Sequence, residues 1–327
     1  EMSFDLGGGG FSDLSCRKGS PNKMLHLANP RSTSGVIAPV VGERKASGVM
    51  FPRQQAVAKR TVTPPTIGNG SYTWTTKTWS QATNYNYTVN IQVAQQPSFG
   101  VGSPVAILLH GNGGNGSGMI ADWAGELPNH ALFAPNGYSS AWNIVDESKA
   151  PDIEYLTQLI RNLREYSNVA PDKFRILGIS NGGALALRAL LELPDAGLET
   201  VVCVVSSLHN QQYRDDAFYR PADHEDTSST ADNNGYSVEF TPPTGRKCLL
   251  VQNTNDTVIP YNGGSGGVPN TVFYAAQFSA WVLAKSQGYT GDQLGELQII
   301  PTSTCTNILL MLSFMLEVML DMTLTKD

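Results

Sequence analysis

The stretch that decides the fold reads Phe174-Arg175-Ile176-Leu177-Gly178-Ile179-Ser180-Asn181-Gly182-Gly183, followed directly by residues 184–193. The apolar run at 174–177 is typical of a buried strand, and residues 184–193 have a helical period. Between them lies G-x-S-x-G in a strand–turn–helix setting, where a tight turn lifts a serine hydroxyl out of the sheet. A glycine-rich loop without a nucleophile is the alternative. With the strand and the helix in place, we predict that Ser180 is a nucleophile.

The alternation of apolar strands with helical segments continues on both sides of this stretch. Short apolar strands alternate with helical periods, which predicts an α/β fold with a mostly parallel sheet covered by helices on both faces. The predicted strands are 105–109, 131–134, 174–177, 201–205, 248–251 and 297–300, and the predicted helices are 153–165, 184–193 and 272–286. Two earlier β-rich segments, 71–78 and 85–93, predict an antiparallel pair at a sheet edge.

The loop after the strand 105–109 is rich in glycine and reads His110-Gly111-Asn112-Gly113-Gly114-Asn115-Gly116. Acyl transfer needs backbone N–H groups aimed at an oxyanion, and glycines let the backbone come close. We predict that the N–H groups of Asn112 and Asn181 form the oxyanion hole. Neither phosphate-binding glycine pattern fits this loop, and His110 is expected to support the loop rather than to act as a base.

The loop after the strand 248–251 carries Asp256 within Asn253-Thr254-Asn255-Asp256-Thr257-Val258-Ile259-Pro260-Tyr261. A carboxylate there can accept a hydrogen bond from a catalytic histidine and fix its tautomer. Asp256 lies downstream of Ser180, as the order Ser, Asp, His requires. A turn-forming aspartate is the alternative, and the other two loops favour the orienting role.

These pieces together resemble the α/β-hydrolases, and within them esterases similar to polyhydroxybutyrate depolymerases and to feruloyl or acetylxylan esterases. The matching residues are Leu108-Leu109-His110-Gly111, Ala134-Pro135-Asn136-Gly137 leading to Trp142-Asn143, the turn at Ser180, and Asn255-Asp256 with Ile259-Pro260-Tyr261. The resemblance implies carboxylic-ester hydrolysis through an acyl-enzyme, on a small-molecule or polymeric ester, without metal or organic cofactor. It also implies a secreted or extracytoplasmic protein. Trp142 and Tyr261 are candidates to line the substrate pocket, with packing as the alternative.

The pattern breaks at the general base. The five histidines are His26, His110, His130, His209 and His224, so none follows the predicted last strand, where the resemblance places the catalytic histidine. A histidine from another part of the chain is one candidate for the general base. His209, which follows the strand 201–205, is the first candidate for a substitute base, and His224, in a polar stretch at 213–242 that could form a lid, is the second.

The C-terminal segment 302–327 offers another explanation for the missing histidine. Residues 308–320 are nearly all Leu and Met, too short a stretch for a confident membrane span, and they would fit a terminal helix packing on the sheet. Alternatively, a frame shift after Pro301 has replaced the ending. Met319-Leu320-Asp321-Met322-Thr323 can be encoded so that another frame reads Ala-Gly-His-Asp. The segment 302–327 is therefore anomalous and, on this hypothesis, frame-shifted.

Composition divides the chain into three parts. Residues 1–65 are basic and of low complexity, and we expect them to be disordered or processed; residues 66–301 form the predicted hydrolase domain, ahead of the tail. The net charge of −6 argues against a nucleic-acid partner, no membrane partner is expected, and four cysteines without a C-x-x-C pair argue against structural zinc. Two functions remain open: an ester hydrolase, or a catalytically impaired or silent binding protein of the same fold.

Overall fold

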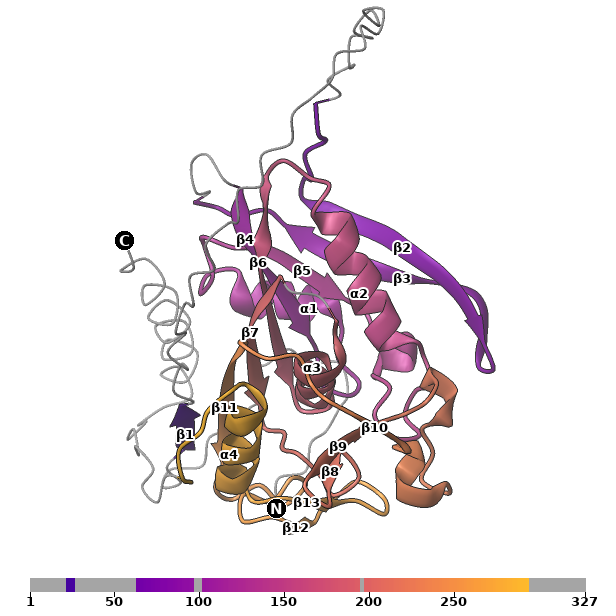
Figure 1. Cartoon of the computed structure of the whole chain (residues 1–327). Helices are drawn as coiled ribbons and strands as arrows, with labels where there is room; N and C mark the ends of the chain where they lie inside the picture. Colours follow the sequence, from indigo (N-terminus) through magenta and orange to yellow (C-terminus); the bar gives the residue numbers. More distant parts are fainter. Residues whose placement is uncertain (1–21, 27–62, 97–101, 195–196, 294–327) are drawn as a thin grey trace, which may run out of the picture.

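Five of the predicted strands, the two β-rich segments and one strand that was not predicted, at 22–26, form an eight-stranded sheet (Figure 1). The computed structural model describes residues 22–26, 63–96, 102–194 and 197–293. The five central strands run parallel to one another, and the three outer ones pair antiparallel with their neighbours. From edge to edge the order is β1 (Asn22–His26), β11 (Lys247–Asn253), β7 (Leu198–Val204), β6 (Val169–Ile179), β4 (Ser103–Leu109), β5 (Ala131–Pro135), β3 (Ala82–Gln92) and β2 (Gly70–Trp79). The mostly parallel sheet and the antiparallel pair β2–β3 at its edge confirm the predictions.

Helices cover both faces of the sheet, as predicted. In β4, Val105 and Ile107 point to the larger apolar core, while Ala106 and Leu108 point to the smaller one. The smaller core is closed by α1 (Gly116–Trp123), and the larger one by α2 (Asp152–Leu163), α3 (Asn181–Glu192) and α4 (Ala276–Ser286). Because side chains alternate along a strand, both faces of the sheet are apolar.

An insertion between β7 and β11 lies at the carboxyl ends of the parallel strands, at the lower side of Figure 1. It holds a three-stranded sheet, and a two-stranded one follows after β11. Short 3-10 turns complete these loops. The insertion contains β8 (Tyr213–Arg214), β9 (Ala217–Arg220), η3 (His224–Asp226), η4 (Asp232–Gly235) and β10 (Val238–Phe240), and the loop after β11 contains β12 (Gly264–Ser265) and β13 (Val272–Phe273). A further turn, η2 (Tyr138–Ser140), lies between β5 and α2.

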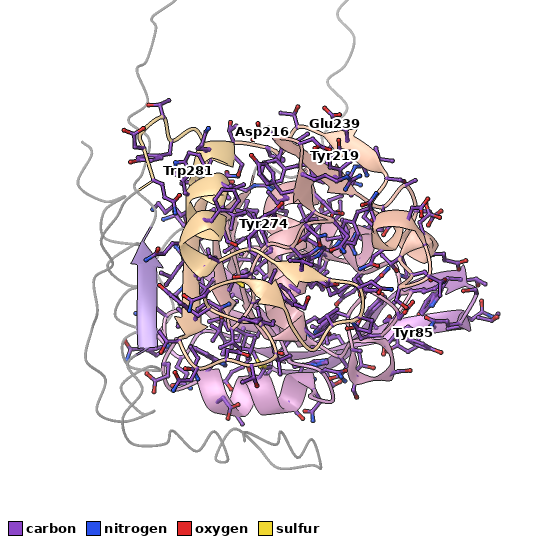
Figure 2. All side chains as sticks on the ribbon, turned by 90° about the horizontal axis from the view of Figure 1, so that it is seen from below. Tyr85, Asp216, Tyr219, Glu239, Tyr274 and Trp281 are labelled. Carbon is purple, nitrogen blue, oxygen red and sulfur yellow. The ribbon has the colours of Figure 1, made fainter. Side chains whose placement is uncertain are left out.

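A chain of aromatic rings joins this insertion to α4. Tyr213 contacts Tyr274 with ring centroids 6.2 Å apart, Tyr274 contacts Phe278 at 5.0 Å, and Phe278 contacts Trp281 at 5.8 Å. In the view from below, Trp281 lies on α4 and Tyr274 next to this helix, on the side of the molecule away from Tyr85 (Figure 2). The insertion is therefore packed onto the main domain, at the edge where the predicted functional loops emerge.

One predicted helix begins later than expected, and one observed helix was not predicted. The predicted helix 272–286 begins only at Ala276, because Val272 and Phe273 pair with β12 and the N–H of Tyr274 bonds to the carbonyl of Leu208. Helix α1 was not predicted, since its first turn is rich in glycine; the Asn115 side chain caps it by accepting from the N–H of Gly118 at 2.9 Å.

Strand β1 falls within the predicted extension 1–65, and most of that extension lies outside the described residues. The predicted strand 297–300 and the whole tail 302–327 also lie outside them. No helix among the described residues has the length and apolar character needed to cross a membrane.

Candidate active site

Ser180 occupies the sharp turn between β6 and α3. Its backbone has φ 54° and ψ −119°, outside the regions that residues other than glycine ordinarily adopt. The N–H of Ser180 donates to the carbonyl of Val204 at 2.9 Å, and its carbonyl accepts from Ala184 at 2.9 Å. The strand–turn–helix setting predicted for Ser180 is thus observed, and strain of this kind is concentrated at functional turns.

The glycines around Ser180 are required by close backbone contacts. A Cβ on Gly178 would lie 2.0 Å from the carbonyl oxygen of Gly182, and a Cβ on Gly182 would lie 2.3 Å from that of Leu109. Any side chain at either position would push the turn away from β4 or open the start of α3. The pattern around the serine therefore follows from packing.

The glycine-rich loop after β4 lies directly against this turn. Strands β4 and β6 are neighbours, with Leu109 paired to Gly178, so both loops leave the same edge of the sheet. A Cβ placed on Gly111 would be 3.6 Å from the Cβ of Ser180. The two predicted oxyanion donors belong to these adjoining loops: the N–H of Asn112 has no protein acceptor within the described residues, and Asn181 begins α3, where N–H groups lack intrahelical acceptors.

His110 supports the glycine-rich loop, as predicted. Its Nδ1 lies 2.7 Å from the carbonyl oxygen of Gly111, and its Nε2 accepts the N–H of Gly137 at 3.0 Å. Because a carbonyl can only accept and an N–H can only donate, the ring must be neutral with its proton on Nδ1. Burial lowers the pKa of His110, against the opposing effect of the bond to Gly111. Both ring nitrogens are occupied, so His110 is not available as a base.

Trp142 and Asn181 join the loops after β5 and β6. The side chain of Asn181 accepts the backbone N–H of Trp142 at 2.7 Å and donates to its carbonyl at 3.3 Å. The indole N–H of Trp142 donates to the carbonyl of His110 at 2.8 Å. The ring of Trp142 is fully buried, so in this structure it packs beneath the loops, which favours the packing alternative over a pocket wall.

A buried polar network that the sequence analysis missed fixes the segment after Trp142. The Asp152 carboxylate accepts the hydroxyl of Tyr87 at 2.8 Å and the N–H of Asn143 at 2.7 Å. Arg188 donates to the carbonyl of Asn143 at 2.5 Å and pairs with Glu192 at 2.8 Å. Burial raises the pKa of Asp152 to about 7, although these hydrogen bonds and Arg188 oppose it.

Asp256 lies in the loop after β11, at the same edge of the sheet. One of its carboxylate oxygens accepts the N–H groups of Val258 and Ile259, each at 2.8 Å. This is the geometry of a turn-forming aspartate, and the second carboxylate oxygen accepts no hydrogen bond from the described residues. No histidine among the described residues bonds to Asp256. Its orienting role remains a prediction.

Tyr261, the other pocket candidate, is buried with 6% of its surface exposed. Burial raises the pKa of its hydroxyl, which interacts with the Gln277 side chain. The carbonyl of Tyr261 accepts the N–H of Ala276 at 2.8 Å at the start of α4. Tyr261 thus anchors α4, and the packing alternative describes it better than a pocket wall.

His209 is packed as a core residue. Its ring meets Tyr236 and Phe273 edge-on, with centroids 5.2 and 6.3 Å apart. Neither nitrogen has a hydrogen bond of normal geometry within the described residues, although the Gln211 side chain interacts with the ring. Burial lowers the pKa of His209 to about 3. No bond between His209 and Ser180 is present in the described part, and a neutral ring packed among aromatic side chains is poorly placed to act as a base. The role of His209 as a substitute base stays a prediction that its packing does not support.

His224 lies on η3, where its Nδ1 hydrogen-bonds to the Asp223 carboxylate and lies 3.7 Å from a carboxylate oxygen of Glu154. These three residues each offer one ligand atom, all within 4.8 Å of one another, and they are the one set of this kind in the described part of the chain that could hold a metal ion. His224 is engaged with these carboxylates, and no hydrogen bond joins it to Ser180 among the described residues. Its role as a base stays a prediction.

The mostly parallel sheet, its strand order and the sharp turn at Ser180 after β6 define the class: the chain has the α/β-hydrolase fold. No family model matches the chain. It is similar to "Putative esterase NocK" from Nocardia uniformis subsp. tsuyamanensis, with 31% identity over 117 residues. The match covers 32% of this chain and 34% of that protein, so it spans about a third of the curated relative's length.

Solved structures similar to this chain are esterases and other hydrolases. The LpqC poly(3-hydroxybutyrate) depolymerase from Bordetella parapertussis has a TM-score of 0.37 and 16% identity, covering 45% of this chain and 56% of that one. The carboxylesterase from Bacillus cereus has a TM-score of 0.30 and 16% identity, covering 37% and 60%.

Proposed function

We propose that the chain is a serine carboxylic-ester hydrolase that acts through an acyl-enzyme, with Ser180 as its nucleophile. The observation that carries the proposal is the strained backbone of Ser180 at the start of α3, with the glycine-rich loop against it. A tight turn of this kind presents a hydroxyl above the sheet and places backbone N–H groups beside it.

The chemistry assigns a role to each group. The Oγ of Ser180 bonds to the acyl carbon and its proton passes to a histidine, while the N–H groups of Asn112 and Asn181 bind the oxyanion. The ester C–O bond then breaks, and the alcohol leaves with that proton. Water releases the acyl group by the same steps in reverse. Asp256 orients the histidine, and no metal or organic cofactor takes part.

The general base is the incomplete part of this proposal. None of the histidines described at His110, His130, His209 and His224 bonds to Ser180. The proposal therefore takes the base from the region after 297, either in the alternative reading frame or in an ending other than 302–327. As proposed, the substrate is a small-molecule or polymeric ester and the protein is secreted or extracytoplasmic, with no nucleic-acid or membrane partner.

The second candidate is a catalytically silent binding protein of the same fold. It is favoured by one observation: no histidine side chain hydrogen-bonds to Ser180 among the described residues. Without a base the nucleophile is weak, and the rate falls by several powers of ten.

A hydrolysis assay with 4-nitrophenyl acetate separates the two. The samples are the full chain, its Ser180→Ala variant, and a version whose residues after Pro301 come from the alternative frame. The esterase proposal expects Ser180-dependent hydrolysis, faster with the alternative ending by several powers of ten. Equal rates for the chain and Ser180→Ala with either ending would contradict it and support the silent protein.

A further inference from the structure

We infer that His110 is a positioning residue for the oxyanion hole: its Nδ1–H fixes the peptide that carries the N–H of Asn112. This inference rests on the proposed function and adds a role that the esterase assay does not test. It starts from one covalent fact. The carbonyl of Gly111 and the N–H of Asn112 belong to the same peptide unit, which is planar and trans, so they point in opposite directions. Fixing one fixes the other.

Two donors hold that carbonyl. The Nδ1 of His110 lies 2.7 Å from the oxygen of Gly111, and the N–H of Gly114 donates to the same oxygen at 3.0 Å. The N–H of Asn112 therefore points away from the His110 ring and cannot rotate without breaking both bonds. Donation into the carbonyl also polarises the peptide, which strengthens its N–H as a donor.

The His110 ring is itself fixed. The N–H of Gly137 donates to Nε2 at 3.0 Å, which leaves Nδ1 as the protonated nitrogen. The other tautomer would put two hydrogens between Nε2 and Gly137 and leave Nδ1 with no proton for Gly111. The loop after β5 thus selects the tautomer that orients the loop after β4.

Hydrogen bonds through Trp142 and His110 also link the second proposed donor, the N–H of Asn181, to the N–H of Asn112. The indole of Trp142 donates to the carbonyl of His110, which holds the peptide just before the one that carries Asn112. The side chain of Asn181 binds the backbone of Trp142 at both its N–H and its carbonyl. Since the N–H of Asn181 is the other proposed donor, the two donors are linked through Trp142 and His110. Pre-set donors of this kind are effective because they need no reorganisation during the reaction.

The test compares His110→Ala with His110→Asn in the full chain, using the rate at which 4-nitrophenyl acetate acylates Ser180. An asparagine amide can place a donor near the Nδ1 position, so it should restore most of what alanine loses. We expect alanine to slow acylation about 10- to 100-fold with little change in KM, since an oxyanion donor acts on the transition state. His130→Ala is the matched control, because His130 is equally buried but bonds to Arg175; it should lower stability and leave acylation of the folded protein unchanged.

Two outcomes overturn the inference. One is an unchanged acylation rate in His110→Ala while Ser180→Ala is inert, which leaves the proposed function intact. The other needs no reaction at all: the ¹⁵N spectrum of the histidine side chains at pH 7 must show His110 neutral with its proton on Nδ1. A proton on Nε2, or an imidazolium, contradicts the inference even if acylation of Ser180 cannot be detected and the proposed function itself fails.

Discussion

The indole N–H of Trp142 donates a hydrogen bond of 2.8 Å to the backbone carbonyl of His110, joining the loops after β5 and β4 beneath the candidate site. Replacing Trp142 by Phe keeps most of the ring but leaves this buried carbonyl without its donor. Such a loss costs about 1–3 kcal/mol of unfolding free energy, measurable by urea denaturation. Trp123→Phe is the control: Trp123 is equally buried, but its indole N–H has no partner within the described residues. It should cost clearly less, and equal losses would argue against the role given to the bond.

Gly182→Ala tests the packing around the turn at Ser180. The added Cβ would meet the carbonyl oxygens of Leu109 and His110 at 2.3 and 2.4 Å. Because these are backbone atoms, they cannot rotate away, and we expect a loss of about 1–3 kcal/mol or more. In Gly125→Ala the new Cβ has no neighbour within 4 Å, so stability should change by less than about 0.5 kcal/mol. Thermal melts of both variants give the comparison.

His209→Phe tests whether His209 is a neutral core residue. The pKa of His209 is about 3 when folded and 6.5 for a free histidine. Between these values the unfolded chain binds a proton that the folded chain does not, so wild-type stability falls as the pH drops from 6.5 towards 3. The slope from this group is at most about 1.4 kcal/mol per pH unit. Phe removes this term, and the variant should gain stability relative to wild type as the pH is lowered. Identical pH slopes in urea titrations would refute this.

Asp152→Asn should produce the opposite pH trend. The pKa of Asp152 is raised from 3.8 to about 7 by burial, so the folded chain keeps a proton that the unfolded chain loses. Wild-type stability therefore falls as the pH rises from 4 to 7, by at most about 1.4 kcal/mol per unit from this group. Asn does not titrate. Its deficit relative to wild type should shrink over this range and stay constant above it, and a constant difference from pH 4 to 7 would contradict the shifted pKa.

Much of the fold could be predicted because its signals are local. Apolar runs such as 105–109 and 174–177 are long enough to mark buried strands, and the turn at Ser180 needs glycines at fixed positions. Helix α1 was not predicted because its start depends on the cap by Asn115 rather than on an apolar period. The start of α4 was misplaced because Val272 is held by a strand pairing far from it in sequence.

The candidate site was predicted less completely, for a similar reason. Ser180 and the glycines at 111 and 182 are recognisable from sequence, since backbone geometry restricts them. The burial of Trp142 and Tyr261 was not, because an aromatic residue in a loop can line a pocket or fill a core. Nor could sequence reveal the network of Asn143 and Asp152, whose partners come from three separate elements.

The central claim is that Ser180 is the nucleophile, and covalent labelling tests it most directly. The version whose residues after Pro301 come from the alternative frame is treated with a fluorophosphonate, which bonds to an activated serine oxygen and loses fluoride, and the labelled peptide is identified by mass spectrometry. The account predicts one phosphonyl group per chain, on Ser180, and no labelling of Ser180→Ala under the same conditions. Labelling of another residue at an equal rate, or labelling that persists in Ser180→Ala, would contradict it.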